Sequence, residues 1–418
     1  MRDPLCWVGL DFATFFLHCC DVLKYGLSFN AACFDSYYTG KRCCAEVVTL
    51  GGGVLPMAAP ELSGLRAELA SDTTSGGTWA AKNASNMPSF IERRALFVED
   101  DEAFATFRRN EDISDGFYSK LDADSEQMLN LMHVSNWGGA LLTSVFPRVR
   151  EQIDGFGSPL LFEFDGVGAM SPDLFNMLFK LMLILRSFED FRAVPEQLSA
   201  PTVDDLRRGP LQRRLLADWD IIEVGGGPGL HAATLVAAMG ARSYSIFDLP
   251  SQQLLQRKVL VNALGREVVD RTFAFPPCCR HLMSADYVLP AYDLFISTYA
   301  FAELTLEMRS RYFYSLIVQS KRGFIIDNYE DIHESRRKQD VGVEHSVDRE
   351  TMGGDGGAFT GLDLVWRLQD LGFDARIATK QQVLDIALHR SRTVIITWAS
   401  TGMDPAARHD MSNSARIR

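Results

Sequence analysis

A glycine-rich turn at residues 223–230 carries the clearest chemical signal in this chain. The segment from residue 221 reads Ile-Ile-Glu-Val-Gly-Gly-Gly-Pro-Gly-Leu, and a helix pattern continues from His231. Glycine reaches the backbone angles of a tight turn at low cost, and its bare backbone lets a ligand approach closely. The first turn of the following helix points unpaired N–H groups at any polar group that lies there. The turn is therefore typical of a nucleotide-binding site.

An aspartate after the next strand pattern strengthens this interpretation. Residues 242–247 alternate as a strand does, and Asp248 follows them, 19 positions beyond Gly229. This is close to the offset of roughly 20 residues at which a second-strand acid reaches ribose hydroxyls. A carboxylate there accepts two hydrogen bonds from a diol and repels a 2′-phosphate. Asp248 could instead cap the helix that starts near Ser251, so both interpretations stay open.

The spacing of the glycines distinguishes two kinds of ligand. Dinucleotide sites usually have the pattern G-x-G-x-x-G, in which the glycines serve a pyrophosphate. This turn has E-x-G-x-G-x-G instead, from Glu223 to Gly229. A carboxylate at the head of the turn suits a cationic ligand end, such as an amino group, better than a pyrophosphate.

With these motifs the chain resembles the class I methyltransferases that bind S-adenosylmethionine, and more narrowly the family of sugar O-methyltransferases. The likeness covers roughly residues 215–400, about half the chain. It rests on the segments 223–230, 247–250, 284–287, 292–304 and 322–328. The first two segments are common to the superfamily, whereas the run Tyr-Ala-Phe-Ala-Glu-Leu at 299–304 is more specific to the family.

The resemblance implies a role for each matched residue. The turn would hold the methionine portion of the cofactor, the acid after the second strand the ribose, and the polar step near residue 286 the adenine. Residues at the end of the fourth strand pattern would face the sulfonium, in agreement with ligand binding beyond the carboxyl ends of strands. The expected cofactor contacts are Glu223, Gly225, Gly226, Gly227, Gly229, Asp248, Leu249, Asp286, Tyr287, Ser297 and Thr298. Asp286 is explained equally well as an ordinary loop acid.

Methyl transfer to a hydroxyl requires alignment, exclusion of water and a base. The sulfonium leaving group is already activated, so the protein mainly aligns donor and acceptor. A sugar hydroxyl is a poor nucleophile and benefits from a general base. Glu303 is the first candidate, with a helix N-terminal acid as the equal alternative, and His231 is the second. We expect Tyr299, Asp327 and Asn328 to contact the acceptor.

Other patterns narrow the chemistry further. The N-methyltransferase signature, Asn/Asp-Pro-Pro-aromatic after the fourth strand, is replaced by Ser-Thr-Tyr-Ala at 297–300, which favours oxygen acceptors. Acids at 327–334 could hold a divalent metal, but they fit a solvated loop equally well, and we expect no metal. The eight cysteines lack the spacing of zinc ligands, and adjacent cysteines rarely bond to each other, so we expect free thiols in a reducing compartment.

Charge and hydropathy limit the partners. The net charge is −12, and residues 1–200 hold most of the excess, with 27 acids against 16 bases. Nucleic-acid phosphates demand a basic surface, so we expect no nucleic-acid partner. No apolar run approaches the roughly 20 residues that span a bilayer. The apolar segment 12–20 lacks the basic start of a secretion signal and is expected to be a helix. We expect a cytoplasmic protein without a membrane span, while the oligomeric state stays open.

The second half of the chain alternates between strand and helix patterns. Strand patterns occupy 219–224, 242–247, 292–297 and 322–327, and helix patterns occupy 230–240, 251–264 and 303–319. This rhythm predicts right-handed crossovers and a parallel sheet. A helix at 362–371, a short strand at 375–377 and a strand at 393–398 follow. The resemblance implies that they form the antiparallel finish of a Rossmann-like methyltransferase sheet.

The first half of the chain is less regular. Segments 97–109, 124–150 and 173–188 have helix patterns, and residues 174–185 are apolar nearly all round, which predicts a buried helix. We expect a mainly helical cap region at 1–200 that shapes the acceptor pocket, a methyltransferase domain at 211–400 and a disordered tail at 401–418. Residues 195–210, rich in proline and charge, are the best boundary candidate.

Three functions compete for these residues. The leading one is an S-adenosylmethionine-dependent O-methyltransferase that acts on a sugar or a similar small hydroxyl acceptor. An NAD-dependent oxidoreductase is the second, and the glycine spacing disfavours it. A non-catalytic, methyltransferase-like binding module is the third, and the intact Glu223, Asp248 and glycines speak against it.

Overall fold

The computed structural model describes residues 96–109, 129–130, 132–133, 136–164, 166–188, 215–276, 291–304, 306–327, 361–379 and 394–401. Several features expected from the sequence lie outside these ranges. They are the apolar segment 12–20, all eight cysteines, the boundary at 195–210, the loop acids at 330–334 and the tail from 402 onward. Among the described residues, no helix combines the length and the apolar character that crossing a bilayer requires.

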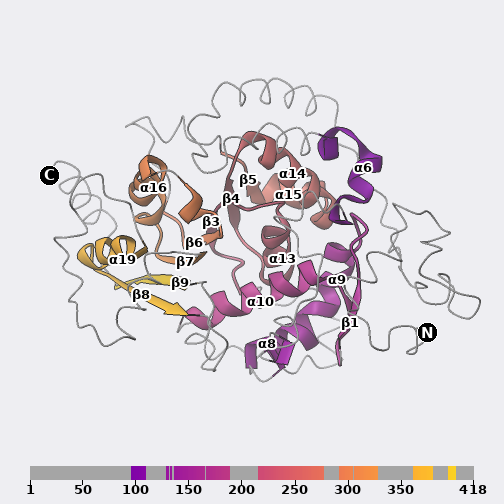
Figure 1. Cartoon of the computed structure of the whole chain (residues 1–418), viewed down its shortest axis with the longest axis horizontal. Helices are drawn as coiled ribbons and strands as arrows, with labels where there is room; N and C mark the ends of the chain where they lie inside the picture. Colours follow the sequence, from indigo (N-terminus) through magenta and orange to yellow (C-terminus); the bar gives the residue numbers. More distant parts are fainter. Residues whose placement is uncertain are drawn as a thin grey trace, which may run out of the picture.

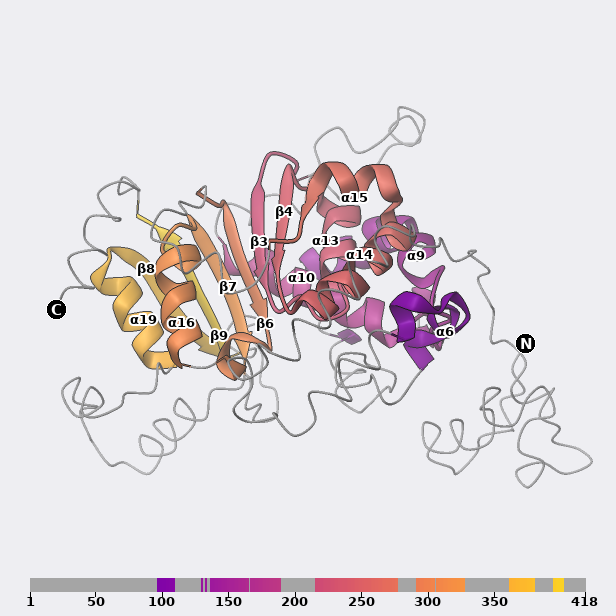
Figure 2. The ribbon, with the colours of Figure 1, turned by 90° about the horizontal axis from the view of Figure 1, so that it is seen from above.

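A seven-stranded mixed sheet forms the centre of the structure (Figure 2). Its strands are β3 (Asp220–Val224), β4 (Ser243–Phe247), β5 (Phe273–Ala274), β6 (Leu294–Thr298), β7 (Arg322–Asp327), β8 (Phe373–Thr379) and β9 (Val394–Ser400). They lie in the order β5-β4-β3-β6-β7-β9-β8. The strands from β5 to β7 pair in parallel, and β9 runs antiparallel to both of its neighbours. The expected α/β class, a mostly parallel Rossmann-like sheet with an antiparallel last strand, is confirmed.

Helices cover both faces of this sheet and enclose two hydrophobic cores (Figures 1 and 2). One face carries α13 (Leu230–Met239), α14 (Pro250–Leu264) and α15 (Arg266–Thr272). The other face carries α16 (Leu306–Tyr312), η10 (Phe313–Ile317) and α19 (Gly361–Asp370). Neighbouring strand residues alternate between the cores, so Ile221 packs on the first face and Ile222 on the second. Strands buried on both faces read as continuous apolar runs, which is why the sequence located them well.

The front half of the chain adds a helical layer to the first core. Its elements are α6 (Asp101–Ala105), η4 (Phe107–Arg109), α8 (Asn136–Ala140), η6 (Leu141–Val145), α9 (Phe146–Asp154), β1 (Phe162–Phe164), β2 (Gly168–Met170) and α10 (Pro172–Ser187). Pro172 opens α10, and the side chain of Ser171 caps it by accepting a hydrogen bond from the N–H of Leu174. Almost the whole of α10 is buried, so the helix expected at 174–185 is confirmed. Both α9 and α10 contact α13.

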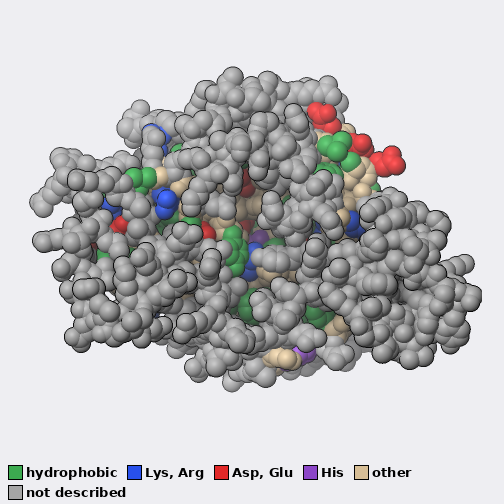
Figure 3. All heavy atoms as spheres, viewed as in Figure 1, with side chains coloured by type: hydrophobic (Ala, Val, Ile, Leu, Met, Phe, Trp, Pro, Cys, Tyr) green, Lys and Arg blue, Asp and Glu red, His purple; other side chains and the backbone are tan. Residues whose placement is uncertain are grey.

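A buried lysine fixes the first described helix to the sheet domain. Lys258 on α14 donates from Nζ to the carbonyl oxygen of Val98 at 3.1 Å and to Oδ1 of Asp101 at 2.6 Å. The same ammonium group lies over the ring of Phe104, 4.7 Å from its centroid. Acidic side chains at the start of α6 also form a red patch on the surface in Figure 3. Because an unpaired buried cation is costly, these contacts dock α6 firmly on α14.

Some elements differ from those that the sequence predicts. The two-residue strand β5, the short helix α15 and the β1–β2 hairpin were all missed. None of them is long enough to show a period in the sequence. The helix predicted at 303–319 is interrupted, since a 3₁₀ turn, η9 (Phe301–Glu303), precedes α16, and η10 continues it as a π-helix. The strand predicted at 375–377 runs from Phe373 to Thr379.

A buried arginine joins three elements of the front half. Arg108 in η4 contacts Asp154 at 3.0 Å and Asp173 at 3.2 Å, and donates to the carbonyl oxygen of Ile153 and the hydroxyl of Ser171. The side chains of Arg108 and Asp154 are fully buried. Buried ion pairs hold a structure together chiefly because removing one partner leaves the other charge without compensation.

We therefore predict that Arg108→Met destabilises the protein by about 3–5 kcal/mol, because it leaves two buried carboxylates without their cation. The free energy of unfolding from urea titration measures this change. Arg376→Met is the control, since its ion pair with Asp374 lies on the surface, and it should leave the urea midpoint nearly unchanged. Equal midpoints for the two variants would show that the Arg108 network contributes nothing to the fold.

Candidate functional site

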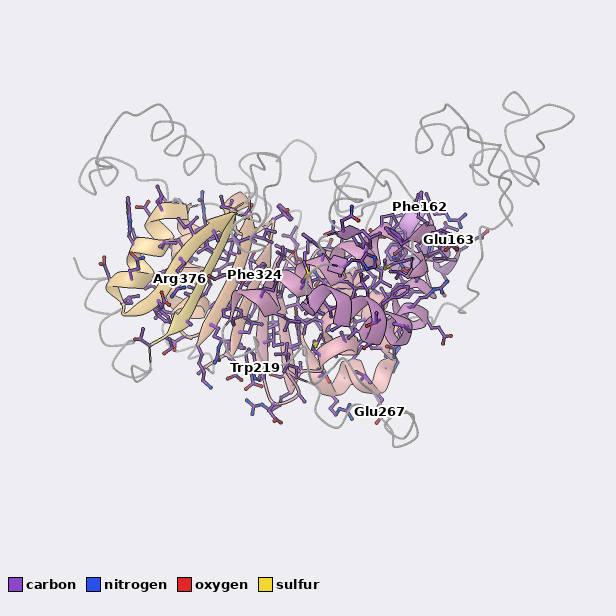
Figure 4. All side chains as sticks on the ribbon, turned by 90° about the horizontal axis from the view of Figure 1, so that it is seen from below. Phe162, Glu163, Trp219, Glu267, Phe324 and Arg376 are labelled. Carbon is purple, nitrogen blue, oxygen red and sulfur yellow. The ribbon has the colours of Figure 1, made fainter. Side chains whose placement is uncertain are left out.

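The carboxyl ends of the parallel strands bring the predicted site residues to one edge of the sheet. Val224 on β3 lies opposite both Phe247 on β4 and Ser297 on β6. The strand order reverses between β3 and β6, and such a switch point is where open α/β sheets bind ligands. In Figure 4, Trp219, just before β3, marks the side of the sheet where the parallel strands begin, and Phe324 lies in the middle of the sheet. The side where the strands begin is held by surface ion pairs, such as that of Arg242, which lowers the pKa of Asp220.

The glycine turn after β3 needs its glycines for two different reasons. Gly225, Gly227 and Gly229 have φ values of +73°, +53° and +89°, which side chains rarely adopt. A Cβ on Gly225 would also overlap the Cβ of Ala300, so the turn lies against the segment after β6. At Gly227 the position of a Cβ has no heavy atom within 4 Å, so the turn presents bare backbone to open space.

The helix that follows this turn has an open N-terminus. Gly229 is the N-cap of α13 and makes no side-chain capping bond, and the first turn contains no acidic residue. The first N–H groups of a helix without a capping side chain can bind an anionic group. The turn and the helix start together present backbone groups without side chains, which suits a ligand with a carboxylate.

Glu223 lies beneath the turn, within the protein. Its side chain is fully buried, Oε1 lies 2.9 Å from Nδ1 of His231, and Oε2 accepts a hydrogen bond of 2.9 Å from the hydroxyl of Tyr244. Burial, together with the nearby charge of Glu223 and this hydrogen bond, raises the pKa of Tyr244 well above its usual value. Both carboxylate oxygens thus have partners on α13 and β4. The predicted contact between Glu223 and a ligand amino group stays a prediction.

His231 is the second residue of α13, and its ring is buried. Because Glu223 is hydrogen-bonded to Nδ1, the proton of a neutral ring belongs on that nitrogen. Nε2 is then an acceptor, and within the described ranges it has no hydrogen-bond partner. This arrangement leaves a lone pair on Nε2, which is the electronic state of a potential base.

Asp248 follows β4 and lies next to the turn. The N–H of Gly225 donates to the carbonyl of Phe247 at 3.0 Å, which joins the two strand ends. Asp248 is nearly buried, and it accepts hydrogen bonds from the N–H of Leu249 at 2.8 Å and from Nε2 of Gln256 at 2.7 Å. The N-cap of α14 is Leu249, not Asp248. Burial and the charge of Asp248 raise the pKa of Tyr312, which approaches from α16.

The end of β6 supplies the third part of this edge. Ser297 is buried and donates from Oγ to the carbonyl of Val224 at 3.0 Å, so its hydroxyl ties β6 to the start of the turn. Thr298 is partly exposed. Tyr299 has a φ of +61°, and its N–H donates to the carbonyl of Ile326 at 2.8 Å. A left-handed backbone at a tyrosine is strained, and such strain concentrates at functional sites.

The front half reaches this edge through α10. Lys180 is 7% exposed, and its Nζ lies 5.5 Å from the centroid of the Tyr299 ring. A cation over the face of an aromatic ring is attracted by the ring quadrupole. A residue of the predicted cap region therefore lies beside a residue expected to contact the acceptor.

The remaining predicted residues are placed only in part. Asp327 is buried at the end of β7, and its Oδ2 accepts a hydrogen bond of 2.8 Å from the N–H of Ala302, which fixes the start of η9. Glu303 closes η9, but the position of its side chain lies outside the description. Asp286, Tyr287 and Asn328 also lie outside the described residues, so their roles stay predictions.

The residues that support this end of the sheet from the protein interior were not predicted from the sequence. Tyr244 and three glutamines of α14, Gln252, Gln253 and Gln256, hold the turn and the end of β4. Only the spacing of the glutamines along the helix could have indicated them, and that pattern is weak. Polar residues at spacing four on an otherwise buried helix indicate a polar target beneath that helix.

No protein-family model matches the sequence, and no curated protein matches it. Several solved structures are similar. A magnesium protoporphyrin IX methyltransferase from Synechocystis PCC 6803 with bound SAH is 14% identical, and the match covers 63% of this chain and 97% of that one, with a TM-score of 0.31. A precorrin-6y C5,15-methyltransferase from Geobacter metallireducens GS-15 is 14% identical over 45% and 83% of the two chains, with a TM-score of 0.27.

The DhpI–SAM–HEP complex is a third similar structure. It is 18% identical, over 55% of this chain and 99% of that one, with a TM-score of 0.27. Likenesses at this level do not reveal the reaction or the acceptor of this chain. The fold assignment rests on the strand order and directions of the chain itself.

The raised pKa of Tyr244 gives a prediction about alkaline unfolding. The unfolded tyrosine loses its proton near pH 10, whereas the folded one keeps it to higher pH. The unfolded state then binds fewer protons, so stability is fully present below about pH 10 and falls above it, by about 1.4 kcal/mol per pH unit for one group. Tyr244→Phe should remove one such contribution and flatten the decline, as measured by urea unfolding between pH 8 and 11. Identical slopes in the two proteins would contradict the assignment.

Proposed function

We propose that the protein is an S-adenosylmethionine-dependent O-methyltransferase that transfers a methyl group to a hydroxyl of a sugar or a similar small acceptor. The observation that carries the proposal is the open space over the bare backbone of Gly227, beside Asp248. A turn that presents no side chain, next to a carboxylate on the neighbouring strand end, suits an adenosyl group. The strand order supports the same proposal, because the switch point lies at this turn.

Each part of this edge fits a different part of the cofactor. The open N-terminus of α13 suits the methionine carboxylate. Asp248 suits the ribose diol, because its carboxylate lies at the end of the neighbouring strand, beside the turn, where a second-strand acid reaches ribose hydroxyls. When bound, the cofactor supplies a methyl group on a positively charged sulfur. The turn, Thr298 and the segment after β6 would hold that group in line with the acceptor and keep water away.

The acceptor side of the proposal rests on the segment after β6. Tyr299 begins this segment, and Asp327 accepts a hydrogen bond from the N–H of Ala302 within it. Lys180 of the front half lies over the ring of Tyr299. The sequence Ser-Thr-Tyr-Ala at 297–300 stands where N-methyltransferases have their Asn/Asp-Pro-Pro-aromatic signature, which favours a hydroxyl acceptor. Glu303 and His231 are the two candidate bases. His231 has the support of an unpartnered Nε2 among the described residues and of a carboxylate at Nδ1.

We predict that S-adenosylhomocysteine binds with a Kd in the micromolar range, and that Gly227→Val weakens binding at least ten-fold because its side chain fills the open space. Isothermal titration calorimetry measures both values. Gly265→Val is a matched control, since Gly265 also has a positive φ and open space at its Cβ but lies between α14 and α15. The two variants share the strain of the left-handed backbone, on the order of 1–2 kcal/mol, yet only Gly227→Val should lose the ligand.

Two outcomes would overturn the proposal. One is wild-type protein that binds NADH but not S-adenosylhomocysteine in the same calorimeter, which would favour an oxidoreductase. The other is tight binding with no methyl transfer to any of a broad panel of sugars and other hydroxylated acceptors. That result would favour a binding module without catalysis.

The base can be assigned with two substitutions, Glu303→Gln and His231→Asn, and the Kd of S-adenosylhomocysteine for each variant shows whether its turn is intact. If Glu303 is the base, Glu303→Gln lowers methyl transfer by a factor on the order of 10²–10⁴ while the Kd of S-adenosylhomocysteine stays the same. His231→Asn then has the smaller effect. Initial rates with radiolabelled S-adenosylmethionine and the best acceptor of the panel measure the difference. The reverse order of the two variants assigns the base to His231, and no loss in either removes both residues from the reaction.

A further inference from the structure

The first two turns of α14 carry three glutamines whose amides hold the strand ends around the glycine turn. We call Gln252, Gln253 and Gln256 the glutamine brace. Pro250 opens α14, and positions 252 and 256 lie one turn apart on the same helix face. Gln252 and Gln253 are buried, and Gln256 is fully buried, although glutamine is usually a surface residue.

Gln256 links the turn to the aspartate beside it. Its Nε2 donates to the carbonyl oxygen of Gly227 at 2.7 Å and to Oδ2 of Asp248 at 2.7 Å. Both targets are acceptors, so only the NH₂ end of the amide can face them. Oε1 has no hydrogen-bond partner in the described part of the chain. Gln256 therefore joins two segments through its NH₂ group while its buried Oε1 makes no hydrogen bond to any described residue. Burying an unpaired oxygen costs free energy, so the two bonds of the NH₂ group must offset that cost.

The same side chain also supports the turn by contact. A Cβ on Gly229 would lie 3.3–3.4 Å from Cα, Cβ and Cγ of Gln256, and a Cβ on Gly226 would lie 3.3 Å from its Nε2. The turn therefore packs directly against Gln256, and a side chain at Gly226 or Gly229 would have to displace it by a few tenths of an ångström. Gln252 adds a second hydrogen bond to the carbonyl of Gly227.

Gln253 extends the brace to the next strand. Its Nε2 donates to the carbonyl of Ile246 at 3.0 Å and to that of Pro276 at 2.7 Å. Pro276 lies just after β5, at the start of the segment toward the predicted adenine contacts, Asp286 and Tyr287. One helix thus holds the segments after β3, β4 and β5 through three amides.

From this geometry we propose that Gln256 is a positioning residue for cofactor binding: it sets the distance between Asp248 and the bare turn so that both bind one ribose-containing ligand. Gln253 holds β4 and the segment after β5 through bonds of the same kind, away from Asp248. This inference rests on the proposed function. The turn and Asp248 lie on separate strand ends, and binding is tighter when such groups are held in place before the ligand arrives. Gln256 therefore affects binding through the contact between Asp248 and the ribose, and it need not touch the ligand itself.

Gln256→Met tests this role, because methionine keeps the volume of glutamine and removes the hydrogen bonds. The measurement compares the Kd of S-adenosylhomocysteine with that of its 2′-deoxy analogue, by calorimetry on the full chain. Without this amide Asp248 is no longer held in place before the ligand arrives, and we expect that loss of pre-organisation to weaken binding about ten-fold or more. We expect that loss for S-adenosylhomocysteine. For the 2′-deoxy analogue we expect at most a three-fold loss, because its contact with Asp248 is already reduced.

Two control variants define what a structural role alone would do. Gln369→Met removes an amide-to-carbonyl bond at an exposed position far from the turn, from Nε2 of Gln369 to the carbonyl of Ala375 at 3.0 Å, and should change neither Kd. Gln253→Met should weaken both ligands by the same factor, because it acts on the segment after β5. If Gln256→Met fails to fold, Gln256→Asn replaces it, since the shorter amide stays neutral and polar but cannot reach both Gly227 and Asp248.

The outcomes separate this inference from the proposed function. If the wild-type protein binds neither ligand, the proposed function fails first. If the wild type binds S-adenosylhomocysteine and the Gln256 variant loses the same factor for both ligands, Gln256 supports the fold only and the inference is overturned. A larger loss for S-adenosylhomocysteine than for its 2′-deoxy analogue, with an unchanged Gln369 variant, supports the inference.

Discussion

The close approach of the glycine turn to its two neighbouring strand ends is the constraint on which the rest of the site depends. Gly225 lies against Ala300 on one side and donates its N–H to Phe247 on the other. A side chain at this position would force the ends of β3 and β6 apart. Because the turn is held this tightly, the backbone at Gly227 faces open space instead of folding back on the protein. The same contact brings Asp248 and Tyr299 to a common edge.

Buried polar groups beneath the turn maintain this arrangement. Glu223 is satisfied by Tyr244 and His231, while Gln256 joins Gly227 to Asp248. Polar groups inside a protein rigidify it when they are fully paired and weaken it when they are not. Two atoms around the turn, Nε2 of His231 and Oε1 of Gln256, lack partners within the described residues. The network thus combines paired groups that support the turn with two polar atoms that make no hydrogen bond to the described residues. Such atoms often mark functional sites.

The sequence predicted the sheet well and the contacts within the site poorly, for physical reasons. The strands from 220, 243, 294 and 322 are buried on both faces and appear as apolar runs, so their positions followed from composition. The position of Asp248 followed from a general offset that the geometry of βαβ units imposes. The partners of Glu223 could not be predicted, because Tyr244 reaches it only through the register of β3 and β4. Gln256 was also missed, since a helix pattern gives no indication of which loop a polar side chain meets.

A crystal structure of the protein soaked with S-adenosylhomocysteine tests the central claim most directly. The account predicts ribose oxygens within about 3 Å of the Asp248 carboxylate and the homocysteine carboxylate at the first turn of α13. It also predicts that the ligand lies over Gly227 and does not displace Gln256. A ligand bound elsewhere, or a turn that must unfold from Ala300 to admit it, would contradict the account.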